Sequence, residues 1–320
     1  AKQFNHPEWF GSTFYDIIMP LFLFVVGAVI PFSLSKRMQE NTSKSTLYLK
    51  LLKRFVLLFI LGWIVQGNLL KFDSEQFRIF SNTLQAIAVG YFFSCISYIH
   101  LTKKWRYFVF VSCLISYALL LSVTNVPGLG QSELLPDQNL ALYIDRFVFG
   151  KFDDGTQYTW LLSGFGFTAT TLSGIFAGEL IKSKHPRKKV AMYLMIYGII
   201  GLTIGLIWGI WHPIVKKIWT SSFVLASSGI CYLLLAFFYW VIDVKGKIKW
   251  VFPLKVIGSN AITAYVLSHV FNFPKIANYL LFGLEKYLGA YYEVINTIGG
   301  FGLLYLLLWY MHKNNTFIKI

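Results

Sequence analysis

Apolar runs long enough to cross a membrane recur along the whole chain, and they limit its fold more than any other feature. A helix needs about 20 apolar residues to cross about 30 Å of hydrocarbon. Nine such segments are visible, at residues 15–34, 54–69, 83–101, 107–124, 159–181, 190–211, 220–242, 251–271 and 291–311. Lipid offers no hydrogen-bond partners to backbone N–H and C=O groups, so a spanning segment must be a helix or part of a closed β-barrel. The alternation of apolar and polar residues that marks a β-barrel strand is absent. The segments therefore predict an all-α polytopic membrane helix bundle.

Composition agrees with this fold and excludes a disordered chain. Hydrophobic residues make up 56% of the chain and charged residues 13%, against about 45–50% and about 25% in soluble domains. The longest stretch between predicted spans, residues 125–158, is too short for an independent domain. We therefore expect one transmembrane domain over residues 1–320.

The net charge of +15 is explained by membrane topology. Of the 29 basic residues, 20 lie on alternate loops, at residues 36–54, 103–106, 182–189, 245–255 and 313–319. The positive-inside rule places these loops and the C-terminus in the cytoplasm, and residues 1–14 and 125–158 outside. Nucleic acid is not needed to explain the charge.

Nine spans leave the N-terminus outside, and the chain begins at Ala1 without a methionine. We expect a truncated N-terminus, with a missing first helix that would give ten spans in the full-length protein. Cys95, Cys113 and Cys231 fall within predicted spans without metal-type spacing. They are expected to be small buried hydrophobic residues, with neither a disulfide nor a metal site.

The N-terminal segment combines a histidine with an acidic residue at the start of a predicted span. Gly11 permits a tight turn, and Thr13 or Ser12 can cap the helix that follows. Asp16 then has two interpretations that spacing alone leaves open. It either interacts with the helix dipole as a capping acid, or accepts a hydrogen bond from His6 and raises the basicity of that ring.

Other polar residues lie at the depth of the predicted membrane. Gln85, Glu179 and Asn260 are the clearest examples. Polar side chains in spans are candidates for function, but they also serve as hydrogen-bonding contacts between helices. Both interpretations stay open for Gln85 and Asn260.

The N-terminal motif resembles the signature of the heparan-α-glucosaminide N-acetyltransferase family and its bacterial acyltransferase relatives of the DUF5009 type. The motif reads His6-x-x-Trp9-x-Gly11-x-Thr13-x-x-Asp16-x-x-x-Pro20-x-Phe22-x-Phe24-x-x-Gly27. Four further segments resemble the family in the same order: residues 78–85, residues 143–146, Trp219-Thr220-x-Ser222 with the Asp243-Val-Lys-Gly end of its span, and Gly258-Ser-Asn260. The resemblance extends over essentially the whole chain.

The resemblance implies transfer of acetyl from cytoplasmic acetyl-CoA to the amine of a glucosamine-type sugar on the far side of the membrane. His6 would then act as general base, with a covalent acetyl-His intermediate as the rival mechanism. No metal is expected. The chain departs from the family at Ala86, where many members have arginine, and the family's first helix, which carries an asparagine, precedes this sequence.

Several residues receive roles from this resemblance. Lys53, Arg54, Lys245 and Lys247 are candidates for the phosphates of coenzyme A. The pantetheine arm would pass near Gln85 and Asn260. Candidates for sugar contacts on the outer side are Trp9, Asp145, Asp153 and Trp219, although both tryptophans also suit interfacial anchoring.

Two other functions are consistent with the same sequence. An O-acyltransferase for an envelope polysaccharide would use the same histidine-centred site. A secondary transporter fits less well, because transporters commonly show internal repeats and broken helices at the membrane midplane. The expected location is the bacterial inner membrane, and the large apolar surfaces would permit a homodimer.

Overall fold

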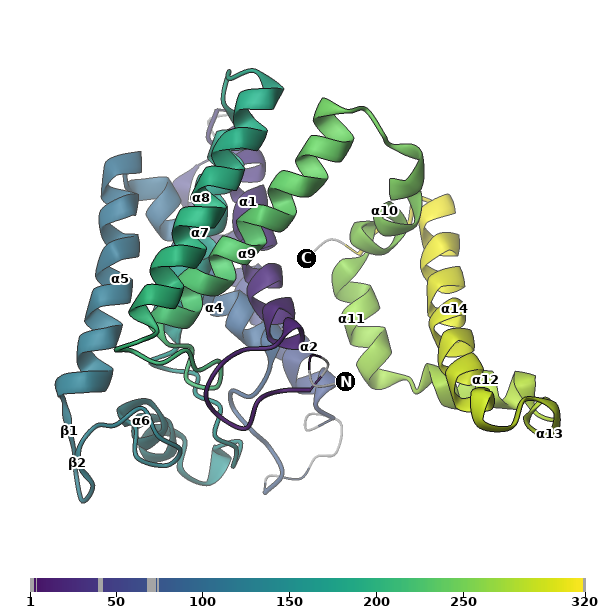
Figure 1. The fold of residues 1–320 in the computed structure, drawn as a ribbon, viewed down its shortest axis with the longest axis horizontal. Coiled ribbons are helices and arrows are strands. Elements are labelled where there is room, and N and C mark those ends of the chain that lie inside the picture. Colours follow the sequence, from purple (N-terminus) through teal and green to yellow (C-terminus); the bar gives the residue numbers. More distant parts are fainter. Residues whose placement is uncertain (1–2, 4, 40–42, 68–72, 74, 319–320) are drawn as a thin grey trace. The chain divides into compact units, whose positions relative to one another are not determined.

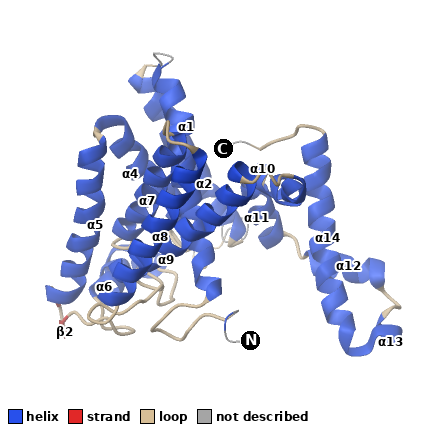
Figure 2. Ribbon diagram, turned by 45° about the horizontal axis from the view of Figure 1, so that its top comes forward, coloured by secondary structure: helices blue, strands red, loops and turns tan. Residues whose placement is uncertain are grey.

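The computed structural model describes residues 3, 5–39, 43–67, 73 and 75–318, and the regular secondary structure of this part of the chain is almost wholly helical (Figure 2). It forms two compact units, which are described separately: residues 1–62 with 75–246, and residues 63–74 with 247–320. The prediction of an all-α polytopic membrane protein is confirmed. The single transmembrane domain over 1–320 stays a prediction.

The first unit contains most of the helices (Figure 1). Its elements are the short helix η2 (Phe14–Ile17), α1 (Ile18–Gln39), residues 44–62 of α2 (Lys44–Val65), α4 (Thr83–His100), α5 (Lys103–Val123), β1 (Asn125–Val126), β2 (Gly130–Gln131), α6 (Leu140–Phe149), η3 (Gly150–Phe152), α7 (Gly164–Lys182), α8 (Arg187–Trp208), α9 (Ser221–Tyr239) and the π-helical turn η4 (Trp240–Val244). The two short strands pair antiparallel.

The second unit is smaller and contains the C-terminal helices. They are η5 (Lys249–Val251), α10 (Phe252–Ser259), α11 (Ala261–Val270), α12 (Phe273–Leu281), α13 (Glu285–Leu288), η6 (Gly289–Tyr291) and α14 (Tyr292–Lys313). The long helix α14 packs against α10, α11 and α12.

Helix α7 forms the centre of the first unit. It packs against α1, α4, α5, α8 and α9, and every residue from Gly166 to Gly178 is buried. The hydroxyl groups of Thr170 and Thr171 are satisfied by carbonyls one turn earlier in the helix. Burial within protein rather than lipid explains why this helix contains so many small and polar residues.

Glycines bring α1 and α7 into backbone contact. A Cβ added at Gly174 would lie 2.0 Å from the carbonyl oxygen of Phe24, and one at Gly178 would lie 2.1 Å from that of Ala28. On the opposite helix, a Cβ at Gly27 would lie 2.0 Å from the oxygen of Thr171. Only residues without a side chain permit so close an approach of two helices.

The loops gather at two ends of the first unit, as the alternating charge pattern predicts. At one end Gly11 bonds to Ile214, and Thr159 bonds to Lys217. At the other end the ammonium of Lys182 contacts Pro31, and the guanidinium of Arg187 contacts Asp243. The assignment of these ends to the two sides of the membrane stays a prediction.

Each of the nine predicted spans overlaps a helix, but nine membrane crossings are not confirmed. Among the described residues, five helical segments are long and apolar enough to cross: Phe14–Lys36, Lys103–Val123, Arg187–Trp208, Ser221–Val244 and Glu285–Lys313. The predicted span 251–271 is two helices, α10 and α11, bent by 65° at their junction. Counted together they would give a sixth crossing. Residues 68–69 of the predicted span 54–69 lie outside the described part of the chain.

A buried ion pair joins α5 to α7 at the end of the unit opposite the Gly11 loop. The guanidinium of Arg106 donates to the carboxylate of Glu179, with exposed side-chain fractions of 9% and 15%. Arg106 also donates to the carbonyl of Leu101. Glu179 is a candidate for function because of its predicted depth in the membrane. The ion pair with Arg106 gives it a structural role as well.

We expect Glu179→Ala to destabilise the chain by about 3–5 kcal/mol, because it leaves the Arg106 charge buried without its partner. The double variant Arg106→Met, Glu179→Met should lose less than Glu179→Ala alone, since no unpaired charge remains. Thermal unfolding in detergent measures both. A double variant less stable than Glu179→Ala would contradict this account of the pair.

Candidate active site

The N-terminal segment docks on a distant loop through its backbone. The N–H of Gly11 donates to the carbonyl of Ile214 at 2.8 Å, and Gly11 pairs with Val215 as an isolated parallel bridge. Gly11 has φ of +93°, a left-handed conformation that favours glycine. This docking brings residues 6–16 against the loop 209–220 between α8 and α9.

The His6 and Asp16 side chains form a hydrogen-bonded pair. His6 Nδ1 lies 2.5 Å from Asp16 Oδ1; the Asp16 side chain is fully buried, whereas that of His6 is 36% exposed. With Nδ1–H donating to the carboxylate, the lone pair of the ring is on Nε2. The predicted His6–Asp16 contact is therefore present in the structure.

The second oxygen of Asp16 also has partners. Asp16 Oδ2 accepts hydrogen bonds from the backbone N–H of Thr13 at 2.8 Å and from its hydroxyl at 3.2 Å. These bonds cap η2, which leads directly into α1. The contacts of both interpretations are present, since one oxygen caps the helix and the other bonds to His6, while the effect of Asp16 on the basicity of the ring stays a prediction.

A lysine that the sequence reasoning missed completes this group. Lys216 Nζ lies 3.3 Å from Asp16 Oδ1 and 3.4 Å from His6 Nδ1. Its side chain is 11% exposed, and this burial lowers the pKa of Lys216, while the adjacent Asp16 carboxylate opposes the shift. The available signal was that Lys216 and Lys217 are adjacent basic residues in the set of loops that carries few basic residues.

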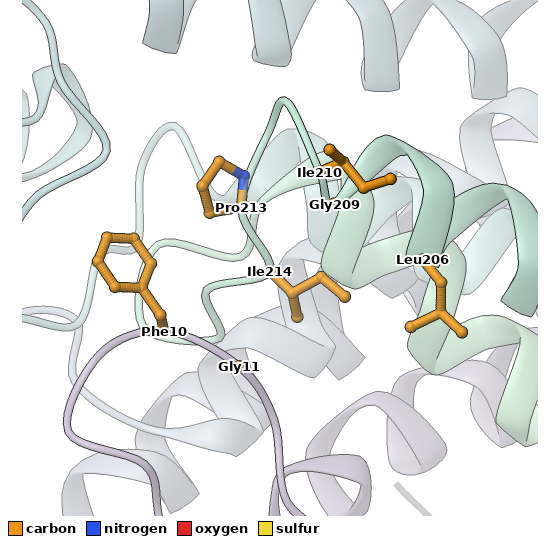
Figure 3. A pocket seen from close by; sticks show the side chains of 7 residues that line it. All are labelled: Phe10, Gly11, Leu206, Gly209, Ile210, Pro213 and Ile214. Carbon is orange, nitrogen blue, oxygen red and sulfur yellow. The ribbon is translucent and has the colours of Figure 1, made fainter.

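An apolar pocket adjoins the same docking contact (Figure 3). It has a volume of about 450 Å³ and is lined by Phe10, Gly11, Leu206, Gly209, Ile210, Pro213 and Ile214. None of these residues has a titratable side chain. The pocket can accommodate an apolar group beside the segment that carries His6, but its lining supplies no group for acid–base chemistry.

The two tryptophans expected to face a sugar are buried instead. Trp9 is 7% exposed, and its indole N–H donates to the carbonyl of Leu134 at 2.7 Å. Trp219 is 2% exposed, lies against Gly166 on α7, and donates to the hydroxyl of Thr170. The loops pack on one another and enclose both side chains, and contact of either ring with a sugar stays a prediction.

Asp145 is also buried rather than exposed to solvent. Its carboxylate oxygens accept hydrogen bonds from the N–H groups of Trp160 at 2.5 Å and Leu161 at 3.1 Å, just before α7. Asp153, the fourth sugar candidate, is partly exposed and accepts a bond from the N–H of Gly155. Asp153 is thus the most accessible of the four candidates, and the sugar contacts of all four stay predictions.

Burial raises the pKa of Asp145 to about 7, despite the two N–H donors that favour its charged form. The raised value means that the folded chain retains a proton that the unfolded chain loses above its ordinary value of 3.8. Stability should therefore fall as pH rises from about 4 to about 7. Asp145→Asn should flatten this slope in thermal unfolding, although it lowers stability overall by losing one acceptor. An unchanged slope would contradict the prediction.

Gln85 is satisfied within its own turn. Its Oε1 accepts a hydrogen bond from the N–H of Ser81, and its Nε2 donates to the carbonyl of Ile79. Asn82 caps α4 beside it, with its side-chain oxygen accepting bonds from Leu84 and Gln85. Contact of Gln85 with pantetheine, which stays a prediction, would require exchange of one of these bonds.

Arg54 is the basic candidate with the most distinctive surroundings. It lies in the middle of α2, and its guanidinium carbon is 4.2 Å from the centre of the Tyr91 ring on α4. Its Nε is buried without a hydrogen-bond partner among the described residues. The neighbouring candidate Lys53 is exposed. Arg54 therefore has hydrogen-bonding capacity that an anionic ligand could use.

The remaining candidates lie beyond α9. Lys245 lies near the end of the first unit and is exposed, and its Nζ is 5.5 Å from the ring centre of Trp240. Lys247 and Asn260 belong to the second unit, where Lys247 is exposed. Asn260 is buried at the bend between α10 and α11, and it bonds to the backbone of Thr316 and Ile318. Its side chain fixes the C-terminal tail, and a role with coenzyme A stays a prediction.

Comparison with known proteins supports the resemblance seen in the motifs. A protein family described as a domain of unknown function, DUF5009, matches residues 1–67, which include His6 and Asp16. The heparan-alpha-glucosaminide N-acetyltransferases of Homo sapiens and Mus musculus are each 26% identical, over 333 and 326 aligned residues. The alignments cover 84% and 82% of this chain, and 49% and 48% of the relatives. The chain thus spans about half the length of the curated relatives it matches, and the predicted resemblance is confirmed.

Proposed function

We propose that this chain, which resembles heparan-alpha-glucosaminide N-acetyltransferase over most of its length, is a membrane-bound N-acetyltransferase. It would move acetyl from acetyl-CoA to the amine of a glucosamine-type sugar. The observation that carries the proposal is the hydrogen bond between His6 and the fully buried Asp16. A carboxylate in this position fixes the tautomer of the ring and stabilises its protonated form.

In this proposal His6 acts as the general base. Its Nε2 removes a proton from the acceptor amine as the amine nitrogen forms a bond to the acetyl carbonyl carbon. Asp16 Oδ1 stabilises the imidazolium through Nδ1–H, and Asp16 Oδ2 remains bonded to Thr13. The carbon–sulfur bond of the donor then breaks, and the thiolate takes up a proton. A thioester is already activated, so positioning and one base are enough without a metal.

Acetyl-CoA supplies the activated acetyl group and arrives with several phosphate charges. Arg54 is the strongest candidate for holding an anionic part of it, because its buried Nε has no partner among the described residues. Lys53, Lys245 and Lys247 add exposed positive charge. These assignments rest on charge and available hydrogen-bonding groups.

We place His6 on the outer, periplasmic face of a bacterial inner membrane and the C-terminus in the cytoplasm. The positive-inside pattern supports this placement, since the set of loops that includes the His6 segment carries only 9 of the 29 basic residues. The acetyl group would therefore enter from the opposite side to the acceptor. A homodimer is compatible with the apolar surfaces and stays a prediction.

The proposal is tested by supplying the purified chain with acetyl-labelled acetyl-CoA and different acceptors in detergent. We expect label to enter glucosamine, whose amine is free, and not N-acetylglucosamine, whose amine is blocked. Labelling of N-acetylglucosamine would instead support the O-acyltransferase alternative. Uptake of sugar into vesicles without acetyl-CoA, together with no labelled product, would support a transporter and contradict the proposal.

A further inference from the structure

Among the residues that the structure describes, Lys216 is the one charged side chain in contact with the His6–Asp16 pair that has no part in the motif or in the proposed reaction. Its ammonium touches both members, at 3.3 Å from Asp16 Oδ1 and 3.4 Å from His6 Nδ1. Because Nδ1–H already donates to Asp16, the ammonium and the ring share a single carboxylate oxygen. Two donors on one oxygen place a positive charge directly beside the imidazole.

The backbone around Lys216 is held firmly in this position. The Lys216 carbonyl accepts a hydrogen bond from the N–H of Trp219, which closes a tight turn. Trp219 has φ of +51°, an uncommon conformation for a large residue, and its ring is buried against Gly166 of α7. On the other side of the turn, Val215 pairs with Gly11. The central helix thereby fixes the lysine, and the lysine contacts the base.

Rings enclose the ammonium on two sides. Its nitrogen lies 5.9 Å from the ring centres of both Tyr15 and Tyr158. Burial and the nearby Asp16 carboxylate raise the pKa of Tyr158, so that phenol stays neutral and does not cancel the lysine charge. Asp16 and Tyr15 on the N-terminal segment, Lys216 on the 209–220 loop and Tyr158 before α7 are the titratable groups of this cluster.

We propose that Lys216 is a positioning residue whose positive charge, shared on Asp16 Oδ1 with the His6 ring, favours the neutral imidazole that can accept a proton from the acceptor amine. This role rests on the proposed function. The carboxylate alone would favour the imidazolium, while the adjacent ammonium opposes it. Asp16 therefore orients the imidazole, and the Lys216 ammonium disfavours its protonation before the acceptor binds.

The test compares Lys216→Met with two matched variants. Lys216→Arg keeps the positive charge, and Lys217→Met removes a charge from the next residue, whose ammonium contacts Gln157 and Trp9 instead. The first readout is the pH at which His6 becomes reactive to diethyl pyrocarbonate, which modifies neutral imidazole, followed by peptide mass spectrometry. The second is the pH profile of kcat/KM for acetyl transfer.

Lys216→Met should shift the labelling midpoint of His6 to higher pH by about one unit, because loss of a neighbouring positive charge favours the imidazolium. The acidic limb of the rate profile should move in the same direction. Lys216→Arg and Lys217→Met should leave both near the values of the unsubstituted chain. A labelling midpoint unchanged in Lys216→Met would overturn the role of Lys216 even if the chain is active. If the midpoint shifts in Lys216→Met but the unsubstituted chain shows no acetyl transfer, the charge effect is supported and the proposed function is overturned instead.

Discussion

Replacing His6 by Ala should lower the rate of acetyl transfer by about 10²–10⁴-fold, the range that a general base contributes. The reason is that the structure offers no second base at this position. Among the described residues, Lys216 is the other titratable side chain in contact with Asp16, and as an ammonium it has no lone pair to accept a proton. The loss should appear in kcat, because the proton is transferred during the chemical step. Initial rates with labelled acetyl-CoA and glucosamine measure it.

His6→Gln separates the chemical role of the ring from its structural role. A glutamine amide can donate a hydrogen bond to Asp16, as His6 Nδ1 does, but it cannot accept a proton at neutral pH. We expect His6→Gln to unfold at a temperature close to that of the unsubstituted chain and to be as inactive as His6→Ala. Full activity in His6→Gln would remove His6 from the reaction.

Gly174→Ala should strongly destabilise the packing of α1 on α7, although it adds a single methyl group. The new Cβ would lie 2.0 Å from the carbonyl oxygen of Phe24 and 3.0 Å from the backbone nitrogen of Ala28. Backbone atoms cannot move aside as a flexible side chain can, so α1 and α7 must separate. Overpacking in cores costs about 1–3 kcal/mol, and we expect this variant to lie at or above the top of that range. Size-exclusion chromatography and thermal unfolding after detergent extraction measure the effect.

Gly302→Ala is the matched control for this substitution. Gly302 lies within α14, and no atom among the described residues would lie within 4 Å of its Cβ. Alanine favours a helix over glycine by about 0.8–1.0 kcal/mol, so this variant should be as stable as the unsubstituted chain or more so. Equal stability of Gly174→Ala and Gly302→Ala would show that close α1–α7 contact does not hold the unit together.

Much of the fold follows from hydropathy, because a buried helix and a lipid-facing helix both need a long apolar run. The same similarity explains what hydropathy misses. Helix α7 is predicted as an ordinary span, yet its residues from Gly166 to Gly178 are enclosed by other helices. The apolar run 251–271 is continuous in sequence, but the chain bends at Asn260 between α10 and α11. The side chain of Asn260 there forms hydrogen bonds with the backbone of Thr316 and Ile318 in the C-terminal tail.

The candidate site was predicted in part, for a local reason. His6 and Asp16 lie ten residues apart, so one turn and one cap can bring them together. Lys216 lies 210 residues from His6 and reaches it through the pairing of Gly11 with Val215, which no spacing rule describes. The burial of Trp9 and Trp219 depends on the same packing of distant loops, which their spacing in the sequence does not indicate.

The most direct test of the account is a structure of the chain with acetyl-CoA bound. If His6 is the base, one amine nitrogen must fit between its Nε2 and the carbonyl carbon of the thioester. A hydrogen bond of about 3 Å and an approach of about 3–3.5 Å, meeting at the tetrahedral angle of the nitrogen, place these two atoms about 5 Å apart. We predict the thioester at that distance from His6, at the end of the first unit where Gly11 meets Ile214. A thioester at the opposite end, near Arg106 and Glu179, would contradict the assignment of His6 as the base.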